Sequence, residues 1–230
     1  MKRHTFVRIA LAVLLALVVA IYLRYVPDRY DPLARLDIAE SPTIFTAAKL
    51  ARLKDDAAAC FAALDGVRID YLRMADRKTG VGCGFSAAAV LQRSQISWGG
   101  GVRLSCPMLA AMAVWERHDV QPLAKAILGS PVVRVNHLGS YACRNVNNAE
   151  KGPRSEHAQA NAIDVAGFTL ADGRRIAVRD DWGGEGPKAE FLRAVHDHAC
   201  GRFAAVLGPS YNRLHADHFH LDMGPFSLCR

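Results

Sequence analysis

An apolar run near the N-terminus places the strongest constraint on how this chain can fold. Residues 9–23 are all apolar and stand between Arg8 and Arg24, after a basic start that contains Lys2 and Arg3. This length is at the upper end for the core of a signal peptide and just below the roughly 17–25 residues that span a bilayer. The run predicts export, so the remainder of the chain is expected to fold outside the cytoplasm.

The same run suggests where the protein is located. Phe6, Val7, Tyr25 and Val26 extend it far enough for a single span. No small-x-small cleavage site follows, which favours an uncleaved anchor over residues 1–26 with its basic end in the cytoplasm. We therefore expect one pass through the inner membrane and a periplasmic domain, or a secreted domain if the segment is cleaved.

Composition and proline content divide the rest of the chain. Residues 27–42 contain three prolines and several charges, which is typical of a linker between an anchor and a domain. Residues 43–230 are sufficient for one domain with a sizeable core. Apolar residues make up 51% of the chain and charged residues 22%, a balance that argues against disorder and against a multi-span membrane protein.

The chain is basic, with a net charge of +7 and an isoelectric point near 9.3. Such a charge favours anionic partners, namely lipid head groups, cell-wall polymers or nucleic acid. The basic residues are scattered, and no nucleic-acid motif interleaves them with aromatic residues, so we expect no nucleic-acid partner.

All six cysteines follow the apolar run, and an even number in an exported domain predicts disulfide bonds. Several connectivities are open, and the short separations in sequence favour Cys60–Cys83 and Cys200–Cys229. A zinc site made by cysteines is the alternative, but the sequence has no Cys-x-x-Cys pair, which argues against it.

Hydrophobic periodicity predicts an α+β fold with a mainly antiparallel sheet and flanking helices. Asp172-Gly173 is the strongest hairpin signal in the chain. The expected helices are residues 43–64, 107–128 and 187–200. The expected strands are residues 67–72, 102–104, 132–136, 162–170, 174–178, 204–207 and 218–223.

Two short clusters of polar residues point to chemistry. In the first, alternation along the strand 162–170 places Asp164 among apolar residues, and a buried carboxylate needs a cation or several hydrogen bonds. His157 lies seven residues upstream, across a small loop, and can reach the same point. In the second, strand alternation places His218, His220 and Asp222 on one face. One imidazole can then ligate a metal ion while the other addresses water or substrate, which is the pattern of an open, catalytic zinc site.

Three segments that contain these clusters, 139–144, 155–168 and 215–222, resemble the bacterial extensin-like C-terminal domain family. The likeness covers roughly residues 45–230 and is strongest after Ser140. That family is similar to the zinc peptidases that include the D-Ala-D-Ala peptidases, the penicillin-insensitive murein endopeptidase and the Hedgehog fold. The resemblance implies a zinc ion (Zn²⁺) held by His157, Asp164 and His220.

The resemblance also implies catalytic roles. Histidines of the murein endopeptidase match His218 and His215, and the D-Ala-D-Ala peptidases carry a glutamate base where this chain has Asp217. Strand alternation turns Asp217 away from the ligand face and favours His218 as the base, although a β-bulge reverses that choice. Arg144 matches an arginine that steadies the oxyanion, and a surface arginine beside a bridged cysteine is its alternative.

The expected function is zinc-dependent hydrolysis of peptide bonds in peptidoglycan, as an endopeptidase or carboxypeptidase of the cell envelope. The first alternative is a non-catalytic, zinc-containing domain that binds or scaffolds the cell wall, and the second is a zinc-free adhesion module. Other residues have a structural or peripheral interpretation: hydrogen bonding for Ser155, packing for Trp182, the pocket rim for Tyr211, Asn212 and Arg213, and no role for His196 and His198.

Overall fold

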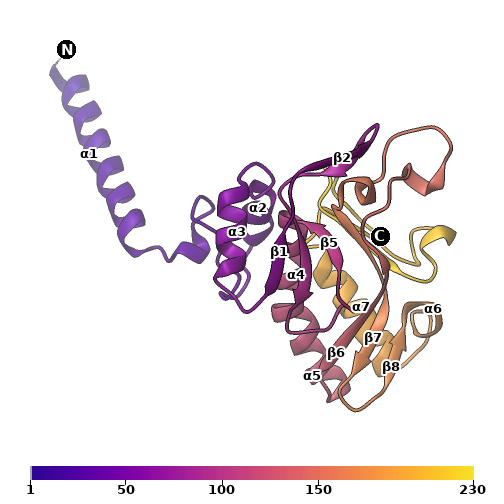
Figure 1. Cartoon of the computed structure of the whole chain (residues 1–230). Helices are drawn as coiled ribbons and strands as arrows, with labels where there is room; N and C mark the ends of the chain where they lie inside the picture. The colour runs from indigo at the N-terminus through magenta and orange to yellow at the C-terminus, as the bar shows by residue number, and fades with distance from the viewer. Residues whose placement is uncertain (1) are drawn as a thin grey trace.

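The structure, a computed structural model, describes residues 2–230 and is α+β (Figure 1). Met1, the first residue of the predicted anchor, lies outside the described residues. The helices are α1 (Lys2–Tyr25), α2 (Thr46–Arg52), α3 (Ala57–Asp65), α4 (Cys106–Trp115), α5 (Gln121–Leu128), α6 (Val178–Asp181) and α7 (Pro187–Ala199). Short 3₁₀ turns are η1 (Asp28–Tyr30), η3 (Val146–Asn148), η4 (Glu156–Gln159) and η5 (Arg213–His215), and η2 (Glu116–Val120) is a π-helical turn.

Three mainly antiparallel sheets confirm the predicted class. The largest has the order β11-β9-β10-β7-β6, with β8 also paired to β7, and only its β11–β9 pair is parallel. Its strands are β6 (Val132–Gly139), β7 (Ala162–Leu170), β8 (Arg175–Ala177), β9 (Ala205–Leu207), β10 (Phe219–Asp222) and β11 (Leu228–Cys229). A second sheet joins β1 (Asp70–Arg73), β4 (Ala88–Arg93) and β5 (Val102–Ser105), and β2 (Arg77–Gly80) pairs with β3 (Cys83–Phe85).

The core forms around α4, whose ten residues are all buried. A helix that is apolar on every side needs neighbours on every side, and α4 has them in α2, α3, β4 and β5. At its end the Trp115 ring contacts Phe168 of β7 and Phe203, and its Nε1 donates to the Val195 carbonyl of α7 (3.1 Å). This residue therefore links the helical layer to the large sheet.

Two predicted helices are interrupted. Residues 43–64 form α2 and α3, because Asp56 caps α3 by accepting a hydrogen bond from the Ala59 amide (2.9 Å). The stretch 107–128 contains η2 between α4 and α5. Pro122, at the start of α5, has no amide hydrogen to continue the α-helical ladder. Gly129 ends α5 in the left-handed conformation, as expected of a helix stop.

The segment between the apolar helix and the domain packs against the domain. Ile38 is 1% exposed and Leu36 is buried in the same core. Lys49 Nζ donates to the Asp28 carbonyl (2.6 Å), and His118 Nε2 donates to that of Ile38 (2.8 Å). The packed part of the chain thus begins ahead of residue 43, because Leu36 and Ile38 are buried in the core.

The helix α1 projects away from the rest of the chain (Figure 1). Of the described residues, only the stretch His4–Tyr22 in this helix is long and apolar enough to cross a membrane. Such a helix is compatible with a signal anchor or a single span.

Three disulfides use all six cysteines. The predicted Cys200–Cys229 bond is present, and it ties the end of α7 to β11. The predicted Cys60–Cys83 bond is wrong, because α3 packs against α4 and places Cys60 beside Cys106. Cys83 instead bonds to Cys143 and fastens the β2–β3 hairpin to the loop after β6.

Candidate metal centre

Two neighbouring strands at the middle of the large sheet supply a carboxylate and an imidazole. In the antiparallel pair β7–β10, His220 is the direct cross-strand partner of Asp164. His220 Nδ1 lies 3.0 Å from Asp164 Oδ1, and both residues are 9% exposed. Directly paired residues project to the same face of a sheet, so the register alone brings the two groups together.

The third residue of the predicted trio arrives from the loop between β6 and β7. His157 lies in η4 and is 1% exposed. Its Nδ1 donates to the Ser140 carbonyl (2.5 Å), and its own carbonyl accepts from the Ala142 amide (3.0 Å). Ala160 follows in the left-handed conformation (φ 55°) and turns the chain into β7. The Ser140 carbonyl therefore orients the His157 ring, and the Ala142 amide holds its backbone, so that Nε2 faces Asp164.

The hydrogen bonds determine the tautomers of both imidazoles. Because His157 Nδ1 donates to a carbonyl, the Nε2 of its neutral ring carries a lone pair. His220 Nε2 donates to Asp222 Oδ2 (3.0 Å), so Nδ1 of its neutral ring carries a lone pair. These two nitrogens lie 3.1 Å apart, and each is 3.0–3.1 Å from Asp164 Oδ1. Three electron-rich atoms at these separations repel one another unless a cation lies among them.

The electrostatics of the trio agree with that requirement. Burial disfavours the charged carboxylate of Asp164, but the imidazoles of His157 and His220, which donate to it when they carry an added proton, outweigh burial and hold its pKa well below the usual range. Burial lowers the pKa of His220, but hydrogen bonds to Asp164 and Asp222 outweigh it and raise the pKa to about 9. The arrangement of the trio therefore favours positive charge among these three side chains.

His218 precedes β10 and faces the same site. The strand begins at Phe219, one residue later than predicted, yet His218 Nε2 still lies 3.6 Å from Asp164 Oδ1. Its Nδ1 donates to Asp217 Oδ1 (2.8 Å). Asp217 does not face the trio, because its other oxygen accepts from Arg179 Nη2 (2.7 Å). The His218 imidazole therefore faces the trio, whereas the Asp217 carboxylate lies on the far side of that ring and bonds to it.

His215 lies beside His218, with ring centroids 5.3 Å apart. Its Nδ1 donates to Asn212 Oδ1 (2.9 Å), and the same oxygen accepts from the Leu214 amide. Burial and the nearby imidazoles His218 and His220 lower the pKa of His215 to about 4. This ring is therefore neutral at physiological pH, with the Nε2 lone pair unused by Asn212.

Arg144 approaches the other carboxylate oxygen of Asp164. Its Nη2 lies 3.7 Å from Asp164 Oδ2. The residue follows Cys143, and its carbonyl accepts from the Ser155 amide (3.1 Å). The Cys83–Cys143 disulfide and this hydrogen bond hold the backbone that carries the guanidinium.

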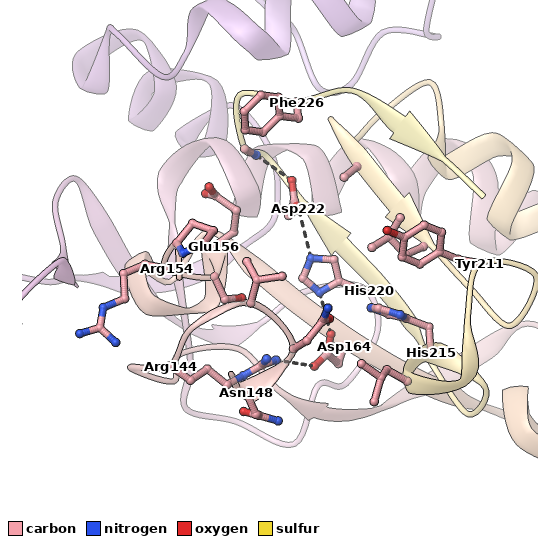
Figure 2. Close-up of a pocket in the computed structure, with 18 of the residues that line it drawn as sticks. Arg144, Asn148, Arg154, Glu156, Asp164, Tyr211, His215, His220, Asp222 and Phe226 are labelled. Atoms are coloured by element: carbon pink, nitrogen blue, oxygen red, sulfur yellow. Dashed lines mark hydrogen bonds and ion pairs between the residues drawn. The ribbon is translucent and has the colours of Figure 1, made fainter. Parts of the chain in front are cut away.

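A pocket of about 460 Å³ opens above the trio (Figure 2). Asp164 and His220 lie at its centre, with Arg144 on one side and His215 and Tyr211 on the other. Lining residues not assigned to the site from the sequence are Val146, Asn147, Asn148, Pro153, Arg154, Glu156, Ala205, Leu207, Leu214, Asp222, Gly224, Pro225 and Phe226. Of these, only Asp222 had a signal in the sequence, because it shares a strand face with His220.

The structure also shows where the residues expected to have structural or peripheral roles lie. Ser155 Oγ accepts from the backbone amide of His157 (3.4 Å), a supporting hydrogen bond. Trp182 packs on His196 and Phe219 and does not line this pocket. Tyr211 lines the pocket, Asn212 supports His215, and Arg213 is absent from the lining.

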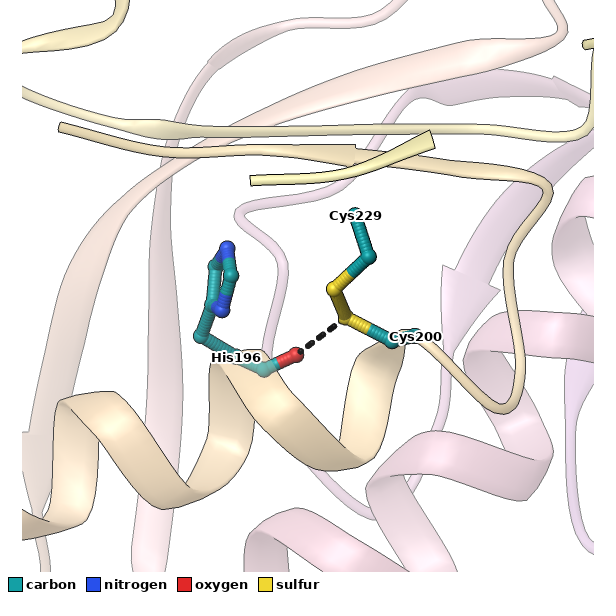
Figure 3. Close-up of side chains that lie close together, drawn as sticks. All are labelled: His196, Cys200 and Cys229. Atoms are coloured by element: carbon teal, nitrogen blue, oxygen red, sulfur yellow. Dashed lines mark hydrogen bonds between the residues drawn. A yellow bond between two sulfur atoms is a disulfide. The ribbon is translucent and has the colours of Figure 1, made fainter. Parts of the chain in front are cut away.

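A second group of potential metal ligands consists of His196, Cys200 and Cys229 (Figure 3). The two sulfurs form a disulfide and have no thiolate to offer. His196 Nε2 instead donates to the Arg230 carbonyl (3.2 Å), and the half-exposed His198 bonds to Asp119. This cluster therefore anchors the C-terminal strand.

The family comparison covers this entire site. The family described as extensin-like protein C-terminus matches residues 58–230, which is most of the chain. No curated protein and no solved structure matches the chain. The chain belongs to the extensin-like C-terminal family.

Proposed function

We propose that this protein is a zinc-dependent hydrolase of peptide bonds in peptidoglycan, acting as an endopeptidase or a carboxypeptidase. The observation that carries the proposal is the convergence of lone pairs from His157 Nε2, Asp164 Oδ1 and His220 Nδ1 within 3.1 Å. The zinc peptidases that the site motifs resemble bind their metal through two histidines and one aspartate.

The donor set fits zinc. With bond lengths near 2.0–2.1 Å, ligand atoms around tetrahedral zinc lie roughly 3.3 Å apart, close to the separations in this trio. Zinc-bound imidazoles usually donate their other N–H to a carbonyl or carboxylate, and here Ser140 and Asp222 accept those hydrogen bonds. Asp164 and His220 line the pocket, so an ion held by the trio would be accessible to water and substrate, as in a catalytic rather than a structural site.

The surrounding residues have distinct parts in hydrolysis. When bound, zinc supplies Lewis acidity toward the scissile carbonyl and makes water a stronger nucleophile at neutral pH. His218 accepts the proton of that water at Nε2, because its Nδ1 donates to Asp217 and the Nε2 lone pair remains free. Neutral His215 accepts a hydrogen bond from a substrate N–H. Arg144 donates to the oxygen on which charge develops.

The proposed substrate follows from compartment and charge. A membrane-spanning α1 would hold the disulfide-bonded domain in the periplasm, next to the cell wall. Arg144 and Arg154 both line the pocket, and the chain carries a net charge of +7. Peptidoglycan stem peptides carry free carboxylates, which Arg144 and Arg154 can bind, and Glu156, Asp164 and Asp222 line the same pocket.

The test uses the full chain in detergent, measured for metal content and then incubated with purified muropeptides. We expect one zinc per chain and cleavage products that disappear with a chelator and return when zinc is added. His218→Ala should lower the rate by roughly 100-fold or more while zinc is retained. His198→Gln is the matched control, because this imidazole lies outside the pocket.

Two outcomes favour the non-catalytic alternatives. Tightly bound zinc with no cleavage, and no effect of His218→Ala, would leave a zinc-stabilised domain that binds or scaffolds the wall. A chain without stoichiometric metal would support the zinc-free adhesion module.

A further inference from the structure

Arg179 forms an ion pair with Asp217, the residue that accepts the hydrogen bond from His218 Nδ1. Arg179 lies in the short helix α6, after β8, and its Nη2 is 2.7 Å from Asp217 Oδ2. The two residues are 38 positions apart. Val178 and Ile176, on either side of the β8–α6 junction, are buried, so the backbone that carries Arg179 is fixed by the core.

Each oxygen of the Asp217 carboxylate has one partner. Oδ1 accepts from His218 Nδ1 (2.8 Å), and Oδ2 accepts from Arg179. A carboxylate held at both oxygens cannot rotate about its terminal bond without breaking one of these contacts. The carboxylate plane, and with it the direction of the hydrogen bond to His218, is therefore set from outside the pocket.

This arrangement determines which nitrogen of His218 faces the site. With its proton on Nδ1, the neutral ring presents the Nε2 lone pair toward Asp164 Oδ1, 3.6 Å away. The opposite tautomer would place a proton where the proposed base needs a lone pair. A hydrogen-bonded carboxylate selects the tautomer in the same way in the Ser-His-Asp triad.

We propose that Arg179 is a positioning residue for His218 and acts through Asp217. The expected effect of Arg179 on kcat rests on the proposed function, whereas its effect on the His218 tautomer does not. The ion pair is exposed, with 72% of the Arg179 side chain and 35% of the Asp217 side chain accessible. Exposed ion pairs contribute little to the free energy of unfolding. We therefore expect the Arg179–Asp217 pair to affect mainly the orientation of His218.

The first experiment measures the tautomer directly. Long-range ¹H–¹⁵N correlation spectra of the imidazoles, recorded on the full chain in detergent, should show His218 protonated on Nδ1 alone. Arg179→Ala should produce a mixture of tautomers, and Arg179→Lys should largely restore the single form. Arg175→Ala is the matched control, because Arg175 is exposed on the adjoining strand β8. An unchanged His218 spectrum in Arg179→Ala would overturn the proposal.

The second experiment separates positioning from substrate binding. Arg179→Ala should lower kcat roughly fivefold, the size that loss of an exposed ion pair can have, with KM and zinc content unchanged. Asp217→Asn should have the larger effect, and adding Arg179→Ala to it should change nothing further, because both act through one hydrogen bond. A raised KM with unchanged kcat would instead make Arg179 a substrate contact and refute the positioning role.

The two experiments fail separately. If the wild-type chain cleaves no muropeptide, the proposed function fails while the tautomer spectra still decide whether Arg179 orients His218. If cleavage occurs but the tautomer does not respond to Arg179→Ala, only the positioning role is lost.

Discussion

His220 lies directly opposite Asp164 in the antiparallel pairing of β7 and β10, with His220 Nδ1 3.0 Å from Asp164 Oδ1. A shift of either strand by one residue would turn one of the two side chains to the other face of the sheet. The pairing register is therefore the main determinant of the candidate metal centre, and His157 completes it from a separate loop.

The first prediction concerns stabilisation by metal. Zinc at a hundred times its dissociation constant should raise the free energy of unfolding by about 2.7 kcal/mol, because the ion binds the folded trio. Asp164→Asn keeps the shape of the side chain but removes its charge, so it should abolish this gain. Denaturant titration with and without zinc measures both. An equal zinc effect in Asp164→Asn would place the ion elsewhere.

The second prediction concerns the carboxylate behind His220. Asp222 Oδ2 accepts from His220 Nε2 (3.0 Å) and makes the opposite nitrogen a better ligand. Asp222→Asn should therefore weaken zinc binding by roughly 10- to 100-fold. Competition with a chromogenic chelator gives the affinity. Asp172→Asn, in the exposed β7–β8 turn, is the control, and equal affinities in the two variants would contradict the role.

The third prediction concerns Glu116, which is 3% exposed and accepts hydrogen bonds from Ser94 and Trp98. Burial raises its pKa from 4.5 to about 7. The folded state therefore holds this proton more tightly than the unfolded state. Its stabilising contribution is full below pH 4.5 and is lost as the pH rises through 7, a loss of about 3 kcal/mol.

Glu116→Gln tests this dependence, because the amide keeps the acceptor oxygen and does not titrate. Urea unfolding of both chains from pH 4 to 8 should give a difference in stability that changes with pH. The wild-type chain should lose stability relative to the variant toward pH 8. A difference that stays constant with pH would show that Glu116 does not change its proton binding on folding.

The fourth prediction concerns the Cys83–Cys143 disulfide, which closes a sequence separation of 60 residues and adjoins Arg144. Replacing both cysteines with alanine should lower the free energy of unfolding by about 4 kcal/mol. Faster amide exchange should appear in residues 139–157, because this bond holds their loop to the β2–β3 hairpin. The matched Cys200/Cys229 pair should leave exchange in that loop unchanged, and faster exchange there would contradict this local assignment.

Much of the fold and the candidate site follows from local patterns. Period-two alternation predicted β7 and the face shared by His218, His220 and Asp222, and both agree with the structure because alternation is a property of one strand. Gly129 and the Asp172-Gly173 turn are likewise local features of the backbone. Asp56 is a residue type that often caps helices, and it separates α2 from α3. Apolar residues at helical spacing on both sides of it led to the prediction of one continuous helix.

Long-range relationships could not be read in this way. Nearness in sequence favoured Cys60–Cys83, whereas the packing of α3 on α4 selected Cys106 as the partner of Cys60. Nothing in the local sequence links Arg179 with Asp217, because their contact depends on how the fold places α6 relative to the residues before β10.

The sequence by itself determined an α+β chain with an N-terminal apolar helix, an even set of cysteines and two clusters of polar residues that supply His157, Asp164 and His220. Only the tertiary structure decided the strand register that pairs His220 with Asp164. It also decided the disulfides Cys60–Cys106 and Cys83–Cys143 and the packing of Ile38 into the core. The physical reason is that a sequence pattern reports the environment of one element. Pairing between elements depends on the packing of the whole chain.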